Sequence, residues 1–461
     1  MKFSTILPIL WANCCLCMII PEFDGIVRFI ENIDGTRSVR AGEGLGQHDP
    51  GNFHTEHQHV AHKTEFLPYR YVIVFNEDIS LQQIQSHMQV VQKDHSTSVG
   101  KLTEDDAFWR VISSSVSSKS QFGGIDNFFD INGLFRGYTG YFTDEIIKII
   151  SQDPIIKFVE QETTVKISNS SLQEEAPWGL HRVSHREKGV TSYVLDTGID
   201  TEHEDFEGRA EWGAVIPAND EASDLNGHGT HCAGIIGSKH FGVAKNTKIV
   251  AVKVLRSNGE GTVSDVIKGI ELVTKEHIES SKKKNKEFKG STANLSLGSS
   301  KSLAMEMAVN AAVDSGVHFA IAAGNEDEDA CLSSPAGAEK SITVGASTFS
   351  DDRAFFSNWG TCVDVFAPGI NIMSTYIGSR NATLSLSGTS MASPHVAGIL
   401  SYFLSLQPAP DSEFFNDAPS PQELKEKVLK FSTQGVLGDI GDDTPNKLIY
   451  NGGGKKLDGF W

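Results

Sequence analysis

The chain has 461 residues, of which 39% are hydrophobic and 21% are charged, and this ordinary globular composition excludes disorder throughout. Because a single hydrophobic core rarely serves so many residues, at least two folded units are expected. The formal net charge of −19 would repel the phosphate backbone of a nucleic acid and an anionic membrane over most of the surface, so neither is expected as a partner.

The first residues have the pattern of a secretory signal. Lys2 precedes an apolar run over residues 6–20, which Pro8 and Asn13 interrupt. The run is too short and too interrupted to span a bilayer comfortably, and no other apolar run reaches that length. We expect a signal peptide over residues 1–21, a soluble mature protein, and a route through the secretory pathway to a vacuole or the cell exterior.

The cysteines divide between this segment and the rest of the chain. Three of the six lie in the signal and would leave with it. The odd number that remains, Cys232, Cys331 and Cys362, indicates one disulfide and one free thiol in an oxidising compartment. We predict a disulfide between Cys331 and Cys362. Cys232 is expected to be a small buried side chain under a helix.

A polar leader and a small folded unit come next. Residues 22–65 are rich in Gly, Asp and His without apolar periodicity, which is typical of a flexible leader. A small α+β unit is assigned to residues 66–170, ending in a polar linker over 168–171 of the kind that proteases cut. Its predicted strands cover residues 69–75 and 155–159, and its predicted helices cover residues 81–91 and 144–151.

Beyond Pro177 the pattern changes to short apolar strands alternating with amphipathic helices. Strands are predicted over residues 190–195, 249–255, 293–297, 319–323, 342–344 and 363–366, and helices over residues 263–278, 303–314 and 390–406. This alternation is typical of an α/β unit, a parallel sheet with helices on both faces, which carries its site at the carboxyl ends of the strands. We assign the unit to residues 171–432 and a C-terminal tail to residues 433–461.

Three separated motifs contain the residue types that nucleophilic catalysis by a serine needs. Asp196 ends an apolar strand, His228 lies between glycines at the start of a helix, and Ser390 lies in the first turn of the last long helix. A serine hydroxyl needs a nearby base to act as a nucleophile, and the base needs a carboxylate to fix its tautomer and stabilise its positive charge. Asn325 follows another strand in Ala322-Ala323-Gly324-Asn325, where its amide and the Ser390 backbone N–H could stabilise an oxyanion.

Other interpretations of these residues are weaker. A lipase-type hydrolase would place its serine before the acid and the histidine, whereas here the order is Asp, His, Ser. His228 and His231 could bind zinc, although no HExxH pattern accompanies them. Asp220, Asp224 and Asn226 suggest a calcium loop, but their spacing fails the EF-hand pattern, and a surface loop leading to His228 is the simpler interpretation.

In these motifs the chain resembles the subtilases, within them the branch of proteinase K and cerevisin. The resemblance covers nearly everything from Phe66 onward. It implies a serine endopeptidase made as a zymogen, in which a ferredoxin-like inhibitory propeptide blocks the cleft and is removed autocatalytically, with cleavage between Lys166 and Pro177. It implies a monomer that needs no cofactor for catalysis and acts on peptide or protein substrates, with its own propeptide as an intramolecular inhibitor.

The resemblance also assigns substrate and metal positions. An extended substrate would add to an edge strand by main-chain hydrogen bonds. The substrate-binding residues implied are Ser296, Leu297, Gly298, Ala323 and Gly324. A structural calcium ion would be held by Glu339, Ser341 and Asp364.

The sequence departs from the family pattern at two places, and it contains three glycosylation sequons. More than a dozen residues are missing between 186 and 190, so an inactive protein with the same fold is the alternative. Ser299 replaces a glycine and could narrow a substrate subsite. Asn169 and Asn381 lie in expected loops and suit N-glycosylation, whereas Asn294 lies in an expected strand and does not.

Overall fold

The computed structural model describes residues 65–103, 106–115, 123–167, 189–283, 288–407 and 418–452. All of these residues belong to one compact unit, Phe53–Trp461. The expected signal peptide, nearly all of the leader, and the 168–171 linker lie outside the described residues. No helix in the described ranges combines the length and apolar character needed to cross a bilayer.

The N-terminal part of this unit is a small α+β domain with the expected ferredoxin-like topology. Its elements are β1 (Phe66–Phe75), α1 (Leu81–Val99), α2 (Ala107–Ser115), β2 (Gly124–Ile131), β3 (Phe135–Tyr141), α3 (Asp144–Gln152) and β4 (Ile156–Ile167). The four strands pair antiparallel in the order β4-β1-β3-β2. Apolar residues of α1 and α3, among them Ile84 and Ile146, pack on Ile73 and Tyr138, so the two helices cover one face of the sheet.

The larger domain is built on a sheet in the order β17-β18-β14-β13-β11-β9-β5-β7-β6, in which every neighbouring pair from β6 to β18 is parallel. Its strands are β5 (Val190–Asp196), β6 (Ala210–Val215), β7 (Lys248–Lys253), β9 (Gly290–Leu295), β11 (His318–Ala322), β13 (Ile342–Ser347), β14 (Val365–Pro368), β17 (Thr433–Gln434) and β18 (Lys447–Leu448). The predicted α/β class is confirmed. Short pieces outside this sheet are η1 (Glu204–Phe206), η2 (Ala330–Leu332), β15 (Ile372–Thr375) and β16 (Thr383–Leu386).

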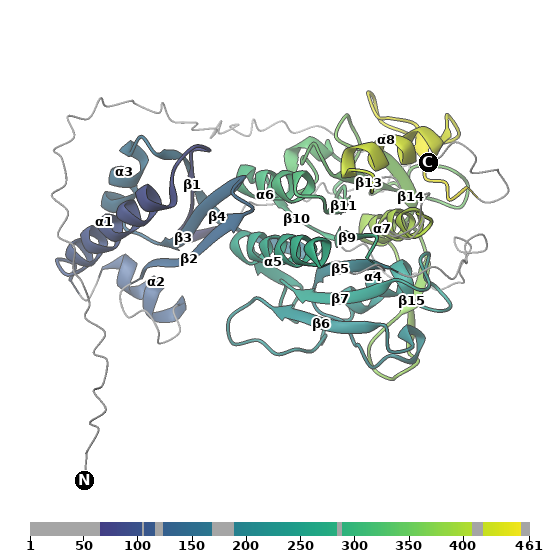
Figure 1. Ribbon diagram of the computed structural model, residues 1–461, viewed down its shortest axis with the longest axis horizontal. Coiled ribbons are helices and arrows are strands. Elements are labelled where there is room, and N and C mark those ends of the chain that lie inside the picture. Colours follow the sequence, from purple (N-terminus) through teal and green to yellow (C-terminus); the bar gives the residue numbers. More distant parts are fainter. Residues whose placement is uncertain are drawn as a thin grey trace, which may run out of the picture. The chain divides into compact units, whose positions relative to one another are not determined.

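Helices cover both faces of the large sheet because its central strands are apolar on both sides. The helices are α4 (His228–Gly237), α5 (Val263–Lys282), α6 (Leu303–Asp314), α7 (Thr389–Ser405) and α8 (Pro421–Phe431). Residues of α4 and α7 share one hydrophobic core with the sheet, and residues of α5 and α6 share the other. Figure 1 shows α5 and α6 together on one side, with α4 and α7 on the other. The helices thereby bring distant motifs to one sheet.

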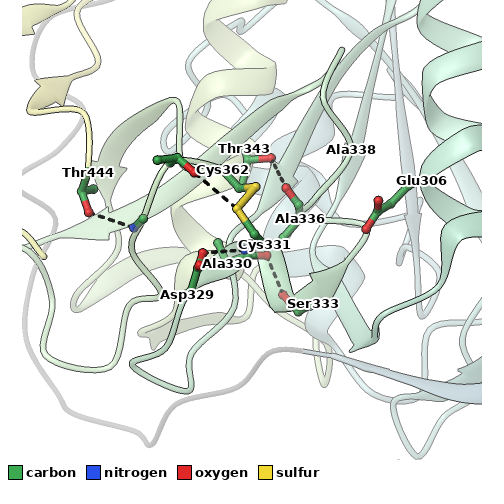
Figure 2. Close-up of a disulfide and its surroundings, with 12 residues drawn as sticks. Glu306, Asp329, Ala330, Cys331, Ser333, Ala336, Ala338, Thr343, Cys362 and Thr444 are labelled. Atoms are coloured by element: carbon green, nitrogen blue, oxygen red, sulfur yellow. Dashed lines mark hydrogen bonds between the residues drawn. A yellow bond between two sulfur atoms is a disulfide. The ribbon is translucent and has the colours of Figure 1, made fainter. Parts of the chain in front are cut away.

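The predicted disulfide is present in the larger domain. Cys331 in η2 and Cys362 form a disulfide with a Cα–Cα distance of 5.3 Å (Figure 2). The two cysteines are 31 positions apart in the sequence, and a cross-link over such a segment stabilises mainly by restricting the unfolded chain. Cys232 is the free, buried cysteine of the described residues.

The last residues of β4 belong to the larger domain's surface. They pair antiparallel with β8 (Glu260–Thr262) on one side and with β10 (Leu297–Ser300) on the other, and β12 (Ser333–Ser334) follows β10. The free face of the small sheet, with Val72, Val74 and Phe129, packs into the core of α5 and α6. The two domains are thus joined by a shared strand and a shared core.

Two carboxylates of β4, the partly buried Glu160 and the buried Glu162, contact the larger domain at the same interface. Glu160 accepts hydrogen bonds from the Ser302 hydroxyl at 2.5 Å and the Ala304 N–H at 3.3 Å, at the start of α6. Glu162 accepts one from the Ser264 N–H at 2.7 Å, at the start of α5. A helix N-terminus has unpaired N–H groups and a positive dipole end, so a carboxylate is stabilising there.

Replacing Glu160 by Ala should weaken inhibition by the small domain. The described hydrogen bonds of its side chain are to the larger domain, whereas its backbone pairs with β1, so the change removes interface hydrogen bonds and keeps the strand pairing of the small domain. Charged hydrogen bonds of this type contribute about 1.5–3 kcal/mol, which corresponds to a rise in the inhibition constant of about tenfold or more. The measurement is the inhibition constant of the separated small domain added to active enzyme. Glu77→Ala, which breaks an exposed ion pair with Lys157, should change it by less than threefold, and equal effects of the two changes would contradict the assignment.

Candidate active site

The three predicted catalytic residues come from three elements of the larger domain. Asp196 ends β5, His228 begins α4, and Ser390 is the second residue of α7. All three are buried. His228 Nδ1 lies 2.8 and 3.0 Å from the two carboxylate oxygens of Asp196, so the carboxylate orients the ring. Asp196 Oδ1 also accepts the Thr197 N–H at 2.7 Å, which fixes the carboxylate.

Ser390 lies against the same group of side chains. Its hydroxyl donates to the carbonyl of Ser296 at 3.2 Å. The sulfur of Cys232 lies 4.0 Å from His228 Nδ1 and 3.4 Å from the carbonyl oxygen of Ser390. One small side chain therefore lies near both the imidazole of His228 and the backbone of Ser390 in the first turn of α7.

The other ring nitrogen of His228, Nε2, is available to accept a proton. Among the described residues, buried Nε2 has no hydrogen-bond partner. Burial lowers the pKa of His228, but the negative charge of Asp196 and the other raising contributions outweigh this, so the net pKa is well above the usual value. The ring has the arrangement of a base, with one nitrogen bound to a carboxylate and the other available to take a proton.

Asn325 follows β11, two strands from β5 in the sheet, with its amide nitrogen unpaired. Its side-chain oxygen accepts the Thr389 N–H at 2.9 Å and the Thr389 hydroxyl at 3.0 Å. These bonds orient the amide, and its buried Nδ2 has no partner among the described residues. A buried donor without a partner costs free energy, so the side chain has the geometry of a donor kept for a ligand or a transition state.

The predicted substrate residues lie where an extended peptide can reach them. Ser296 joins β9 to β10, and Leu297 and Gly298 pair with Ile167 and Lys166 of β4. Ala323 and Gly324 follow β11 and lead to Asn325. Gly324 has φ +107°, and a Cβ there would lie 2.2 Å from Asn358 Nδ2, so the turn requires glycine.

Two polar residues support the site, although the sequence assigned neither of them a role there. Asp224, expected in a surface loop, is buried; it accepts the Gly227 N–H at 2.8 Å and the Thr230 N–H at 3.0 Å, at the start of α4. Asn358 is fully buried and donates to the Ala323 carbonyl at 3.0 Å. The position of Asp224 four residues before His228 is the sequence signal that could have identified it as a helix cap.

The residues expected to hold calcium converge on a cation, but the cation is a lysine. The carbonyl oxygens of Glu339 and Ser341 lie 3.0 and 2.6 Å from Nζ of Lys425, and a carboxylate oxygen of Asp364 lies 3.0 Å from it. The ammonium group fills the place that the ion would take. The three residues therefore do not fit calcium while Lys425 is present.

Zinc is also disfavoured at His228 and His231. His231 Nε2 is hydrogen-bonded to the Leu384 carbonyl at 2.9 Å, and burial lowers the pKa of His231 to about 3. The three potential ligands that do cluster are Asp196, His228 and Cys232. In that cluster the carboxylate and the ring nitrogen are already bonded to each other.

A carboxylate bonded to an imidazole, with a serine and an unpaired amide donor on neighbouring elements of a parallel sheet, is the set of groups that serine peptidases use. Comparison with known families agrees: the model described as "Subtilase family" matches residues 187–445, and the model "Peptidase inhibitor I9" matches residues 70–168. The chain belongs to the subtilase family. It is a serine protease that carries an inhibitor-type propeptide.

Named relatives support the same family. Subtilisin-like protease 3 of Saccharomyces cerevisiae (strain ATCC 204508 / S288c) is 96% identical over 478 positions, covering 100% of both chains. Cerevisin of the same organism is 56% identical, covering 86% of this chain and 66% of that protein. The crystal structure of a cold adapted subtilisin-like serine proteinase aligns with a TM-score of 0.52 and 40% identity, covering 62% of this chain and 96% of that one.

The short connection before β5 does not disturb the site. The alignment with Subtilisin-like protease 3 has 478 positions against 461 residues here, so at least 17 positions lie opposite no residue of this chain. The number agrees in size with the segment expected to be missing between 186 and 190, of which residues 186–188 lie outside the described ranges. Strand β5 is nevertheless formed and Asp196 bonds His228. The alternative of an inactive protein gains no support from this geometry.

Proposed function

We propose that Ser390 is the nucleophile, His228 the general base, Asp196 the residue that orients and stabilises it, and Asn325 an oxyanion donor. The peptide chain is cut while it lies as the central strand between β8 and β10. One observation carries the proposal: the chain's own residues 164–167 already occupy that position. Their path leads toward Ser390.

The register of this strand gives the cleavage position. Leu297 pairs with Ile167, and the Ser296 carbonyl accepts the Ser390 hydroxyl, so continuing the antiparallel register by one position would bring residue 168 opposite Ser296. The Ile167 N–H also donates to the Gly259 carbonyl at 3.1 Å, which extends the pairing with the β8 side. In this register the carbonyl of Ser168 is the one that Ser390 would attack. We place cleavage between Ser168 and Asn169, within the expected interval from Lys166 to Pro177.

The reaction follows from these positions. His228 Nε2 accepts the proton of Ser390 as its oxygen attacks the carbonyl carbon, and Asp196 stabilises the imidazolium that forms. The Asn325 amide and the Ser390 backbone N–H donate to the developing oxyanion. The imidazolium gives its proton to the leaving amine. Water then repeats the sequence on the acyl-enzyme, so the three side chains serve both halves of the reaction.

The domain limits, destination and modification of the chain remain proposals. The propeptide covers residues 66–168, and the peptidase domain reaches past residue 432, because β17 and β18 in the predicted tail join the large sheet at β14. We place the protein in the secretory pathway, in a vacuole or outside the cell, as a monomer. Asn381 is exposed and suits a glycan, Asn169 follows the proposed scissile bond, and Asn294 is fully buried in β9.

The test is to purify the active form, determine its first residue, and label it with a serine-directed phosphonate. The expected results are an N-terminus at Asn169 and a single label on the peptide that contains Ser390, lost when an excess of peptide substrate competes. A label on another serine, or catalysis that continues after complete labelling, would contradict the roles. An N-terminus inside residues 156–167 would contradict the register.

A further inference from the structure

The C-terminal helix α8 places an ammonium group in an oxygen cluster of the large sheet. Lys425, whose side chain is 11% exposed, approaches the carbonyls of Glu339 and Ser341 at 3.0 and 2.6 Å. Its third contact is the carboxylate of Asp364 at 3.0 Å. Glu339 and Ser341 directly precede β13, and Asp364 directly precedes β14, both of which lie close to α8 in Figure 1.

The cluster is matched to a lysine in number and in charge. An ammonium group has three N–H donors, and three oxygens receive them. Its single positive charge balances the single carboxylate. The other Asp364 oxygen accepts the Thr343 N–H at 2.9 Å, so the carboxylate is held in place from the strand side.

A calcium ion would bind poorly at these oxygens while Lys425 occupies them. Calcium takes six to eight oxygen ligands at about 2.3–2.6 Å, so besides the three protein oxygens it needs several waters, and it can bind there only if Lys425 leaves. The Lys425 nitrogen already lies 2.6 Å from the Ser341 oxygen, which is the distance a metal ion would need. Lys447 also contributes positive charge near Asp364. A divalent ion would have to displace one ammonium group and enter the field of another.

We propose that Lys425 is a built-in cation that replaces structural calcium at Glu339, Ser341 and Asp364. The lysine fastens α8 to the starts of β13 and β14, and the peptidase domain keeps this connection when calcium is removed. A chelator cannot remove an ammonium group that is covalently part of the chain. This site therefore makes no contribution to any calcium dependence of the protein's stability. Removal of the lysine should convert the cluster into a calcium site.

The experiment measures thermal unfolding of the full chain in EGTA and in millimolar calcium chloride. Ser390→Ala is present in every sample to prevent self-digestion. In EGTA, Lys425→Ala should lower Tm by about 5 °C, because Asp364 and two carbonyls lose their shared donor. Calcium should restore at least half of that loss. In the double variant that combines Lys425→Ala with Asp364→Asn, calcium should restore none of the lost Tm.

Controls separate a loss of the cation from a loss of packing. Lys430→Ala, an exposed lysine of the same helix, should leave Tm in EGTA within about 1 °C of the parent, as usual for surface changes. Lys425→Met keeps most of the aliphatic part of the side chain and removes the charge. Its Tm should be lower than that of the parent, and calcium should not raise it. It also serves if Lys425→Ala does not fold.

Three results would overturn the proposal. One is a Tm for Lys425→Ala equal to that of Lys430→Ala. Another is a loss of Tm in Lys425→Ala that calcium does not restore. The third is a calcium-dependent rise in Tm of the chain with Lys425 intact that Asp364→Asn abolishes, because the metal would then compete successfully with the lysine.

Discussion

A full chain with Ser390→Ala is expected to remain uncut, with the propeptide attached and no peptidase activity. In the proposed mechanism Ser390 supplies the oxygen that attacks the carbonyl of Ser168, and no neighbouring group in the described site can replace it. In subtilisin, removing the nucleophile lowers kcat by about a millionfold. Ser390 lies in helix α7, where Ala is well tolerated, so the variant should fold. Electrophoresis and mass spectrometry of the purified chain are the measurements.

Ser393→Ala is the matched control for this prediction. Ser393 is another buried serine of α7, and its hydroxyl donates to the Asn294 side chain at 2.8 Å. Its loss removes one hydrogen bond worth about 1 kcal/mol, and self-cleavage should continue. If the Ser390→Ala chain were cut at residue 168 at the control's rate in a protease-deficient host, cleavage would not be autocatalytic. An uncut control would show that the loss reflects folding instead.

The parts of the fold that the sequence revealed best are those buried on both sides. The predicted strands at 293–297 and 319–323 correspond to β9 and β11, because continuous apolar runs have few other places to go. β2 and β6 were not predicted, since half-exposed strands have mixed composition. The motifs at Asp196 and His228 could be assigned to one site because strand ends of a parallel sheet share an edge.

Errors arose where polar residues are buried with partners from distant segments. Strand β4 was predicted to end at Val159, but it continues to Ile167. The charged residues Glu160 and Glu162 interrupt the apolar pattern, yet helices α6 and α5 supply donors for them. Lys425 was missed for the same reason: its partners lie more than 60 positions earlier in the sequence. Local patterns carry no information about such pairs, so the calcium expectation could only be revised from coordinates.

Asn325→Ala should lower kcat by about 10²–10³-fold while leaving KM within a few-fold. The Asn325 amide nitrogen has no partner in the described resting site, so its hydrogen bond forms mainly with the oxyanion, and the loss should appear in the transition state rather than in substrate binding. The measurement is kcat and KM of the matured enzyme on a chromogenic peptide. Asn325→Asp gives the sharper comparison, since its carboxylate can still accept both Thr389 hydrogen bonds but offers no donor.

The Asp variant distinguishes an oxyanion donor from a structural residue. If Asn325 only held Thr389 in place, Asn325→Asp would keep those bonds and most of the activity. If it donates to the oxyanion, the added negative charge should make Asn325→Asp at least as slow as Asn325→Ala. Thr389→Val removes one of the two bonds that orient the amide and keeps the backbone one at 2.9 Å, so it should cost less than tenfold in kcat. The order of the three rates therefore tests whether the unpaired nitrogen stabilises the transition state.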